Sequence, residues 1–361
     1  MSSARCVALL LICCLALALV IGCQPRKLGS EGGTTTSGPT AGPTTPTPPA
    51  GTKGTAPGKQ FVIGMSQCNL AEPWRVQMNA DLKAAAEQQP SIRMEWKDAQ
   101  NQTEKQQEQV REFIQLGVDL IIISPKEARP LAQPVAEAMD KGIPVIVLDR
   151  KVEGDKYTCF IGGDNVRIGE EAGKYMVKLL NGKGKIVELK GLMTSTPAGE
   201  RHDGFTKGIK GSQFQIIFSA DCKWLEEEAQ KEMASALSRF DQIDAVYGHN
   251  DPSAHGAYMA AKQEGKGREK TIKFIGIDAL PHEGVRYVKE GVLAATLQYP
   301  TGGAQAIEMA LKILNGEQVE KNIVLGTRLF TPENVDQGGL EIPPGPLGGE
   351  QPGEPKGTKV K

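Results

Sequence analysis

Runs of Val, Ile and Leu that alternate with amphipathic segments constrain this chain more than any other feature of its sequence. Leu120–Ile123 and Val145–Leu148 are apolar at every position, and Leu131–Lys141 between them carries apolar residues at helical spacing. Strands that are apolar on both faces belong to parallel sheets that helices cover on both sides. The sequence therefore predicts an α/β fold built on parallel sheets.

The same alternation runs through both halves of the folded part, from about residue 60 to about 338. The expected strands are Phe61–Met65, Ile92–Trp96, Leu120–Ile123, Val145–Leu148, Lys185–Leu189, Gln215–Ser219, Ala245–Gly248 and Lys273–Ile277. The expected helices are Trp74–Gln88, Glu104–Leu116, Leu131–Lys141, Arg167–Leu180, Arg201–Lys210, Leu225–Arg239 and Ser253–Glu264. Ligands of such folds bind beyond the carboxyl ends of the strands, so the residues that follow each strand are the candidates for function.

The N-terminus has the pattern of a targeting signal. Arg5 precedes an apolar run from Cys6 to Ile21, which is about 16 residues long and falls short of the roughly 20 that a membrane-spanning helix needs. The run closes on Val20-Ile21-Gly22-Cys23, which resembles a bacterial lipobox. That resemblance implies a lipoprotein signal peptide over residues 1–22 and lipidation of Cys23. The alternative is an uncleaved single-span anchor, and either interpretation predicts export.

Two low-complexity segments flank the folded part. Residues 29–58 contain nine Thr, eight Gly and six Pro, a composition that cannot bury enough apolar surface to offset the entropy of ordering the chain. We therefore expect residues 23–59 to be a flexible tether. Residues 339–361 return to Pro, Gly and Lys, and we expect them to be disordered as well.

Charge and cysteine usage narrow the function classes. Lys and Arg (42) balance Asp and Glu (43), which excludes the strongly basic surface typical of nucleic-acid binders. Cys68, Cys159 and Cys222 would be the thiols of the exported body, so at most one disulfide can form among them. We expect none that is structural.

Polar side chains follow the predicted strands in both halves. The positions are Ser66-Gln67, Ser124, Asp149-Arg150, Gly191, Asp221, His249-Asn250-Asp251 and Asp278. A single Asp or Asn at a strand end is commonly a turn residue, but turn chemistry does not require an Arg directly after an Asp. A carboxylate beside a planar guanidinium matches the paired hydroxyls of a sugar, and Trp covers the apolar face of a sugar ring. These residues favour a polyhydroxylated ligand, with Asp149 expected to contribute to ligand binding and little to the stability of the unliganded protein.

An ordered set of stretches resembles a known family. These stretches are Gly117–Pro125, Ile143–Arg150, Gly163–Asn165, Glu200–Phe205, Val246–Asp251, Gly276–Asp278 and Leu293–Gln298. Together they resemble the type I periplasmic sugar-binding proteins of the ribose-binding type, which are the solute receptors of ABC importers. The Trp74-Arg75 pair, with Met65-Ser66-Gln67 before it, is similar to the galactofuranose-binding branch and departs from the ribose pattern.

The resemblance implies a ligand site and a domain organisation. The ligand-binding positions that it assigns are Glu72, Trp74, Arg75, Asp149, Arg150, Arg201, Trp224, Asn250, Asp278 and Gln298. It implies two Rossmann-like lobes joined by a three-segment hinge, with residues 60–164 and 299–325 in the first lobe and 165–298 and 326–338 in the second. The implied function is capture of a hexose or pentose, in the pyranose or the furanose form, and its delivery to the permease subunits of an ABC importer.

The resemblance further implies a monomer held at a membrane by its lipid anchor in the periplasm or at the cell surface, with no cofactor, no metal and no catalysis. Three other functions were weighed. LacI-type repressors share this body, but they carry a helix-turn-helix where this chain has a signal peptide and tether. His249, Asp251 and His255 would suggest a metalloenzyme, yet a His beside a strand end is more often polar lining, and no nucleophile motif surrounds Ser66 or Ser124. A receptor that feeds a membrane sensor stays open beside the transporter, as do the identity of the sugar and the membrane that holds the anchor.

Overall fold

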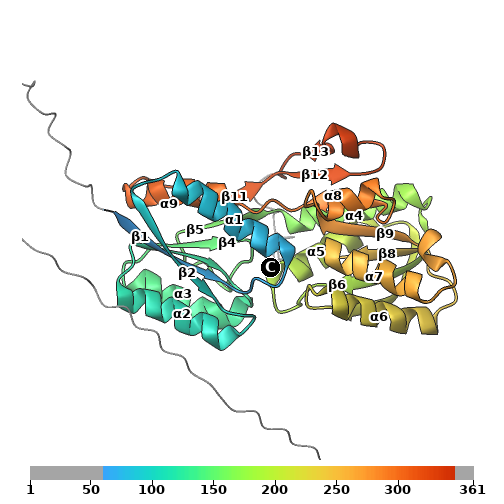
Figure 1. Ribbon diagram of the computed structural model, residues 1–361, viewed down its shortest axis with the longest axis horizontal. Helices are drawn as coiled ribbons and strands as arrows, with labels where there is room; N and C mark the ends of the chain where they lie inside the picture. The colour runs from blue at the N-terminus through green and yellow to red at the C-terminus, as the bar shows by residue number, and fades with distance from the viewer. Residues whose placement is uncertain (1–59, 346–361) are drawn as a thin grey trace, which may run out of the picture. The chain divides into compact units, whose positions relative to one another are not determined.

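The structure, a computed structural model, describes residues 60–345 (Figure 1). Its first sheet has six parallel strands in the order β11-β5-β4-β3-β1-β2. These are β1 (Phe61–Gln67), β2 (Ile92–Asp98), β3 (Leu120–Ser124), β4 (Val145–Leu148), β5 (Cys159–Gly163) and β11 (Asn322–Leu325). One face is covered by α1 (Pro73–Glu87) and α9 (Gly303–Leu314), and the other by α2 (Thr103–Leu116) and α3 (Ala128–Asp140). We call this group the first lobe.

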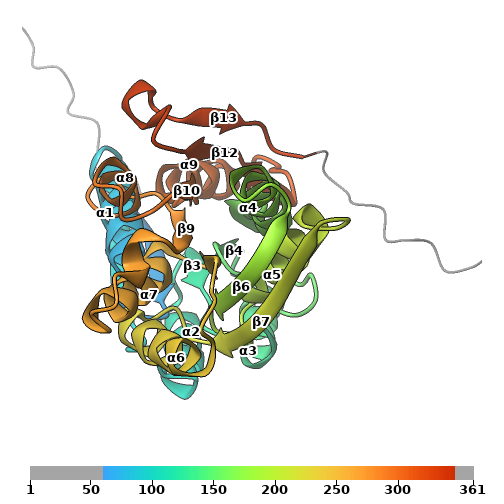
Figure 2. The same cartoon turned by 90° about the vertical axis from the view of Figure 1, so that its right-hand side faces the viewer.

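The second sheet has seven strands in the order β13-β12-β10-β9-β8-β6-β7. These are β6 (Lys183–Lys190), β7 (Gln213–Asp221), β8 (Ala245–Gly248), β9 (Lys273–Asp278), β10 (Ala295–Gln298), β12 (Thr327–Phe330) and β13 (Leu340–Ile342). Its helices are α4 (Asn165–Leu179), α5 (Thr196–Gly208), α6 (Glu226–Arg239), α7 (Asp251–Gln263) and α8 (Gly284–Lys289). Single 3₁₀ turns lie at Arg268–Lys270 and Val335–Gln337. We call this group the second lobe (Figure 2).

Alternate residues of the apolar strands enter opposite layers of the core. In β3, Ile122 joins the buried cluster that includes α1, whereas Ile121 and Ile123 join the cluster under α2 and α3. In β6, Ile186 packs on the side of α4 and Val187 on the side of α6 and α7. This is the burial on both faces that continuous apolar runs predict, and it confirms the predicted α/β fold class.

The chain passes between the two sheets three times. The crossings follow β5, follow β10 and join β11 to β12. They correspond to the three-segment hinge of the predicted fold. No helix within residues 60–345 is long and apolar enough to cross a membrane.

The second sheet differs from the prediction at one edge. β12 and β13 are antiparallel to their neighbours, so the sheet is mixed rather than wholly parallel. β13 also lies inside residues 339–361, which we expected to be disordered. Leu340 and Ile342 alternate along β13 and pair with Leu329 and Thr327 of β12, and Ile342 is buried in the same apolar cluster as Leu329. A three-residue strand among Gly and Pro leaves no signal in composition, which is why this expectation was wrong for residues 340–342.

Other expectations concern residues outside the described part. The signal peptide, Cys23 and its lipid, the whole tether and residues 346–361 all lie there. Within the described residues, Cys68, Cys159 and Cys222 are buried free thiols.

Candidate functional site

A cavity of about 280 Å³ lies between the two lobes, at the carboxyl ends of both sheets. Its lining residues are Glu72, Trp74, Arg75, Asp149, Arg150, Pro197, Arg201, Trp224, Asn250, Asp278 and Tyr299. Nine of the ten positions that the sequence assigned to ligand binding are among them.

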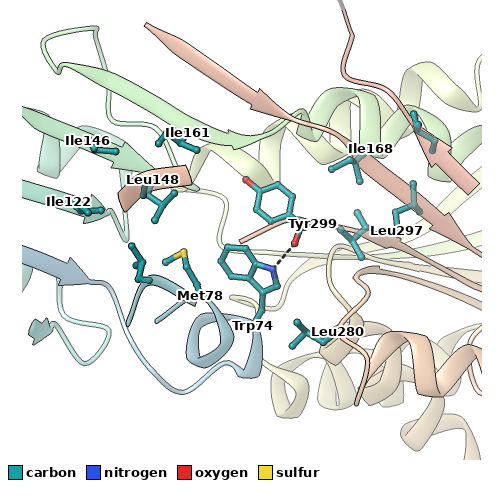
Figure 3. Close-up of a cluster of buried hydrophobic side chains, with 14 of the residues drawn as sticks. Trp74, Met78, Ile122, Ile146, Leu148, Ile161, Ile168, Leu280, Leu297 and Tyr299 are labelled. Atoms are coloured by element: carbon teal, nitrogen blue, oxygen red, sulfur yellow. Dashed lines mark hydrogen bonds between the residues drawn. The ribbon is translucent and has the colours of Figure 1, made fainter. Parts of the chain in front are cut away.

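The N-terminal turn of α1 supplies the aromatic wall on the first-lobe side. Pro73 occupies the first turn of α1, where its missing N–H is not needed. Trp74 follows, and its Nε1 donates a hydrogen bond to the carbonyl of Tyr299 at 2.8 Å (Figure 3). The two rings lie 5.3 Å apart and are tilted by 47°. Since Trp74 also belongs to the buried apolar cluster with Met78, it is fixed in place before any ligand arrives.

Arg75 and Asp149 form a buried network behind this wall. The Arg75 guanidinium is 2% exposed and donates to Gln67 Oε1 at 3.1 Å, Ser124 Oγ at 2.9 Å and Asp149 Oδ2 at 3.0 Å. Ser124 Oγ donates to the same carboxylate oxygen at 3.1 Å. Three strand ends, those of β1, β3 and β4, thereby meet at one ion pair. This ion pair argues against the expectation that Asp149 matters little to the stability of the unliganded protein, because the Asp149 carboxylate lies against a buried guanidinium.

Trp224 stands between two guanidinium groups from opposite lobes. The Arg150 guanidinium lies 5.4 Å from the centre of the Trp224 ring, and that of Arg201 lies 5.2 Å from it. Both distances suit cation–π contact. Trp224 Nε1 is buried and has no hydrogen-bond partner. A buried donor without a partner is costly, so an acceptor on a ligand would be favoured here.

Arg201 is held on three sides, by two residues of the second lobe and by Tyr299 in the crossing that follows β10. From α5 its Nε donates to Asn165 Oδ1 at 2.8 Å, and its Nη1 donates to the carbonyl of His249. Its guanidinium also lies 4.7 Å from the centre of the Tyr299 ring. These contacts fix the plane of the group and orient it toward the cavity that it lines.

Asn250 and Asp278 complete the second-lobe side with different amounts of free hydrogen-bonding capacity. Asn250 caps α7 by accepting from the Ser253 amide at 3.0 Å, and its Nδ2 donates to the Trp224 carbonyl at 3.0 Å. Asp278 has only the distant Arg201 Nη1, 3.9 Å away, as a charged partner. Burial raises the pKa of Asp278 well above its usual range, with Arg201 opposing the shift. Asp278 is therefore the carboxyl group of the site with the most capacity left for a ligand.

Gln298 is the one assigned residue that the structure does not bring to the cavity. It lies at the end of β10 and lines a neighbouring groove with α1 and α9, whereas the next residue, Tyr299, lines the cavity itself. Successive residues of an extended segment point to opposite sides, so Tyr299 rather than Gln298 faces the cavity. Tyr299 and Pro197 were missed. Tyr299 carried a signal, because it follows a strand, but Pro197 at the start of α5 carried none.

The residues weighed as metal ligands lie apart and have other partners. His249 Nε2 contacts Glu188 Oε1 at 3.1 Å, and His255 Nδ1 contacts Glu226 Oε1 at 2.8 Å. Asp251 accepts from Thr296 Oγ1 at 2.6 Å and from the Ala279 amide at 2.7 Å. Each of these groups has a structural role in the second lobe.

Comparison with known proteins identifies the family. Residues 63–318 match the family model of the periplasmic binding protein domain. The chain belongs to this family. In this periplasmic binding protein, the residues that match the family model come from both lobes and include every residue that lines the cavity.

Its relatives confirm the resemblance to type I sugar-binding proteins. It is 31% identical to the ribose import binding protein RbsB of Bacillus subtilis over 76% of this chain and 88% of that protein. It is 30% identical to the galactofuranose-binding protein YtfQ of Escherichia coli over 77% and 90% of the two chains. Among solved structures, the fructose-binding periplasmic domain of a hybrid two-component system is 44% identical, with a TM-score of 0.74 over 77% of this chain and 93% of that one.

Proposed function

We propose that this periplasmic binding protein captures a monosaccharide in the cavity between its lobes. The observation that carries the proposal is the makeup of the cavity. Two indoles, three guanidinium groups and three carboxyl groups converge on a space of about 280 Å³. In such a lining, the guanidinium and carboxyl groups form hydrogen bonds with neighbouring hydroxyl groups of a sugar, and an indole covers the apolar face of the sugar ring. Neither lobe alone holds all of these groups, so a ligand that contacts both favours their closed arrangement.

The sugar that we propose is a hexose in its furanose form. The solved relatives include a fructose-binding periplasmic domain and a galactofuranose-binding protein. Arg75 supports this choice, because it fills a position where the ribose pattern has a second aromatic, and its Nη1 and Nη2 are held by Gln67, Ser124 and Asp149. Titration calorimetry with fructose, galactofuranose and ribose tests the proposal. Saturable binding of a hexose that is tighter than that of ribose is the expected result, and no heat with any sugar would overturn it.

We propose further that the protein is exported, anchored through Cys23 and serves an ABC importer as a monomer without cofactor or catalytic activity. The lipobox-like Val20-Ile21-Gly22-Cys23 supports the anchor, and the ribose import relatives support the importer. Residues 60–164 with 299–325, and 165–298 with 326–338, would be the moving lobes. Intact-mass analysis of the membrane fraction tests the anchor. A mass that retains residues 1–22 without acyl groups would exclude lipidation.

Signal reception is a second candidate. The 44% identical neighbour is the periplasmic domain of a hybrid two-component system. A receptor of this kind would contact a membrane sensor in place of a permease. Co-purification of the sugar-loaded protein from its own membranes discriminates between them, since permease subunits support the importer and a sensor kinase supports signalling.

A further inference from the structure

Among residues 60–345, and apart from contacts of the three crossing segments, four direct hydrogen bonds join the two lobes beside the cavity. On the first lobe the partners are Glu127, Ala128 and Lys151, and on the second they are Thr194, Thr196 and Glu200. Thr194 Oγ1 donates to Glu127 Oε1 at 2.9 Å, and the Ala128 amide donates to the Thr194 carbonyl at 3.1 Å. The Lys151 amide donates to Thr196 Oγ1 at 3.0 Å, and Lys151 Nζ contacts Glu200 Oε1 at 3.1 Å. We call these six residues the clasp.

The clasp uses groups that the lobes leave available for each other. The Ala128 amide is at the first turn of α3, where backbone N–H groups have no partner within the helix, and the second lobe supplies the missing acceptor. Thr194 lies in the connection between β6 and α5, so both of its contacts cross the gap between the lobes. Opening the lobes would break all four bonds together.

None of the six residues lines the cavity. Their bonds run from protein to protein, so they require no ligand and do not depend on which ligand is present. A ligand that needs both lobes binds with an apparent affinity reduced by the fraction of molecules in the competent arrangement. Contacts that favour this arrangement therefore raise affinity for every ligand by the same factor.

We propose that Glu127, Lys151 and Thr194 are positioning residues that set the affinity of this receptor through the closed arrangement of its lobes, without touching the ligand. The inference rests on the proposed function in so far as it concerns sugar affinity. It extends that function, because it separates residues that choose the ligand from residues that set how tightly any accepted ligand is held.

Glu127 offers a matched pair of variants. Its Oε1 accepts from Thr194 of the second lobe, and its Oε2 accepts from Thr103 Oγ1 of the first lobe at 2.6 Å. Thr194→Val removes the bond between the lobes, whereas Thr103→Val removes a bond of the same chemistry within one lobe. Lys151→Met has a similar control in Lys174→Met, because Lys174 pairs with Glu170 and Glu171 on the same helix.

The experiment measures the dissociation constants and dissociation rates of fructose and galactofuranose for the parent and these variants. Thr194→Val and Lys151→Met are expected to weaken both sugars by the same factor, about two- to tenfold for each bond removed, through faster dissociation. The two controls are expected to leave affinity within twofold, and Thr194→Ser is expected to restore it. Unchanged affinity in Thr194→Val and Lys151→Met, or a loss for one sugar only, would overturn the proposal.

A second measurement separates the clasp from the proposed function. Small-angle scattering of the unliganded protein compares the parent with the double variant Thr194→Val/Lys151→Met. A larger radius of gyration in the double variant supports the clasp even if no sugar binds to the parent, which would refute the proposed function alone. If no sugar binds and the two radii are equal, the clasp is refuted as well. Melting temperatures of the variants verify that they are folded.

Discussion

Asp149 combines ligand binding with the stability of the empty cavity. It follows β4 and adopts the left-handed conformation, with φ of 70°, which aims its carboxylate at both Arg75 and the cavity. Asn tolerates this conformation and has nearly the same shape, so Asp149→Asn removes the charge with little change of backbone. The substitution therefore tests what the charge contributes.

Asp149→Asn is expected to weaken sugar binding by at least tenfold and to lower the unfolding free energy of the unliganded protein by about 1–3 kcal/mol. Both effects have one cause, because the buried Arg75 guanidinium loses the nearer of its two carboxylate partners and keeps only Glu72, whose Oε2 lies 3.4 Å from Arg75 Nε. Titration calorimetry and urea unfolding of the unliganded variant measure the two quantities. A loss of affinity with unchanged stability would mean that Gln67 and Ser124 suffice to hold Arg75.

The sequence predicted where Asp149 lies but not what it contacts. A strand end is a local feature, so Asp149 could be assigned to the cavity from the apolar run before it. Its ion pair joins residues 74 positions apart and needs the relative placement of β4 and α1, which no local pattern encodes. The same limit explains Gln298, because the resemblance gave the position in the chain but not the side of the strand to which it points.

The loop between β7 and α6 carries Trp224 into the cavity, and a glycine on a neighbouring strand end makes room for it. A Cβ at Gly191 would lie 2.3 Å from the ring of Trp224, so any side chain there must displace the indole. Gly191→Ala is expected to weaken sugar binding by tenfold or more. Gly199→Ala in α5 is the matched control, because nothing lies within 4 Å of its added Cβ. Calorimetry on both variants tests this, and equal affinities would show that Trp224 does not contact the ligand.

The β12–β13 pair is the element that sequence patterns did not reveal. β5, β10, β11 and β12 were missed as well, because β5 ends in two glycines and the other three include polar residues, so none has the unbroken apolar run of the equally short β4. Long apolar runs such as β3 were found because burial on both faces leaves an unbroken signal. Short edge strands depend on a partner that is distant in the chain, so tertiary pairing rather than local sequence decides them.

Two substitutions in β13 test whether this strand is part of the folded unit. Ile342 is 6% exposed and Leu340 is 59% exposed. Ile342→Ala is expected to lower the unfolding free energy by about 2 kcal/mol, through lost burial and the space left behind. Leu340→Ala is expected to change it by less than about 0.5 kcal/mol. Chemical denaturation decides between order and disorder, because two equal and negligible effects would place β13 outside the cooperative fold.

Buried carboxyl groups of the second lobe link the stability of the whole molecule to pH. Burial raises the pKa of Asp251 to about 7, and its hydrogen bonds from Thr296 and Ala279 offset only part of that shift. Burial also opposes ionisation of Glu188, but the hydrogen bonds and charges of His249 and His202 outweigh it and lower the pKa of Glu188 to about 2. Asp251 therefore stabilises the folded state at low pH, whereas Glu188 stabilises it at higher pH.

The sign for Asp251 follows from proton counting. The folded state holds the proton of Asp251 more tightly than the unfolded state, whose pKa is near 3.8. The contribution of Asp251 to stability is thus complete below about pH 4 and is lost as the pH rises through about 7, with a slope of about 1.4 kcal/mol per pH unit for one proton. Glu188 contributes above its unfolded value, near 4.5, and that contribution is lost as the pH falls toward 2.

Between pH 4.5 and 7, the unfolding free energy of Asp251→Asn is expected to fall less steeply than that of the parent. The difference between the two slopes is expected to approach about 1.4 kcal/mol per pH unit. The amide can accept from the Ala279 N–H and donate to Thr296 Oγ1, so both contacts survive without a charge to bury. Urea unfolding of parent and variant at several pH values gives the difference, which should grow in favour of the variant as the pH rises. Glu226→Gln is the control, since Glu226 pairs with His255 nearer the surface. Parallel curves for parent and Asp251→Asn would mean that Asp251 is ionised throughout this range and that its two hydrogen-bond donors stabilise the charge against burial.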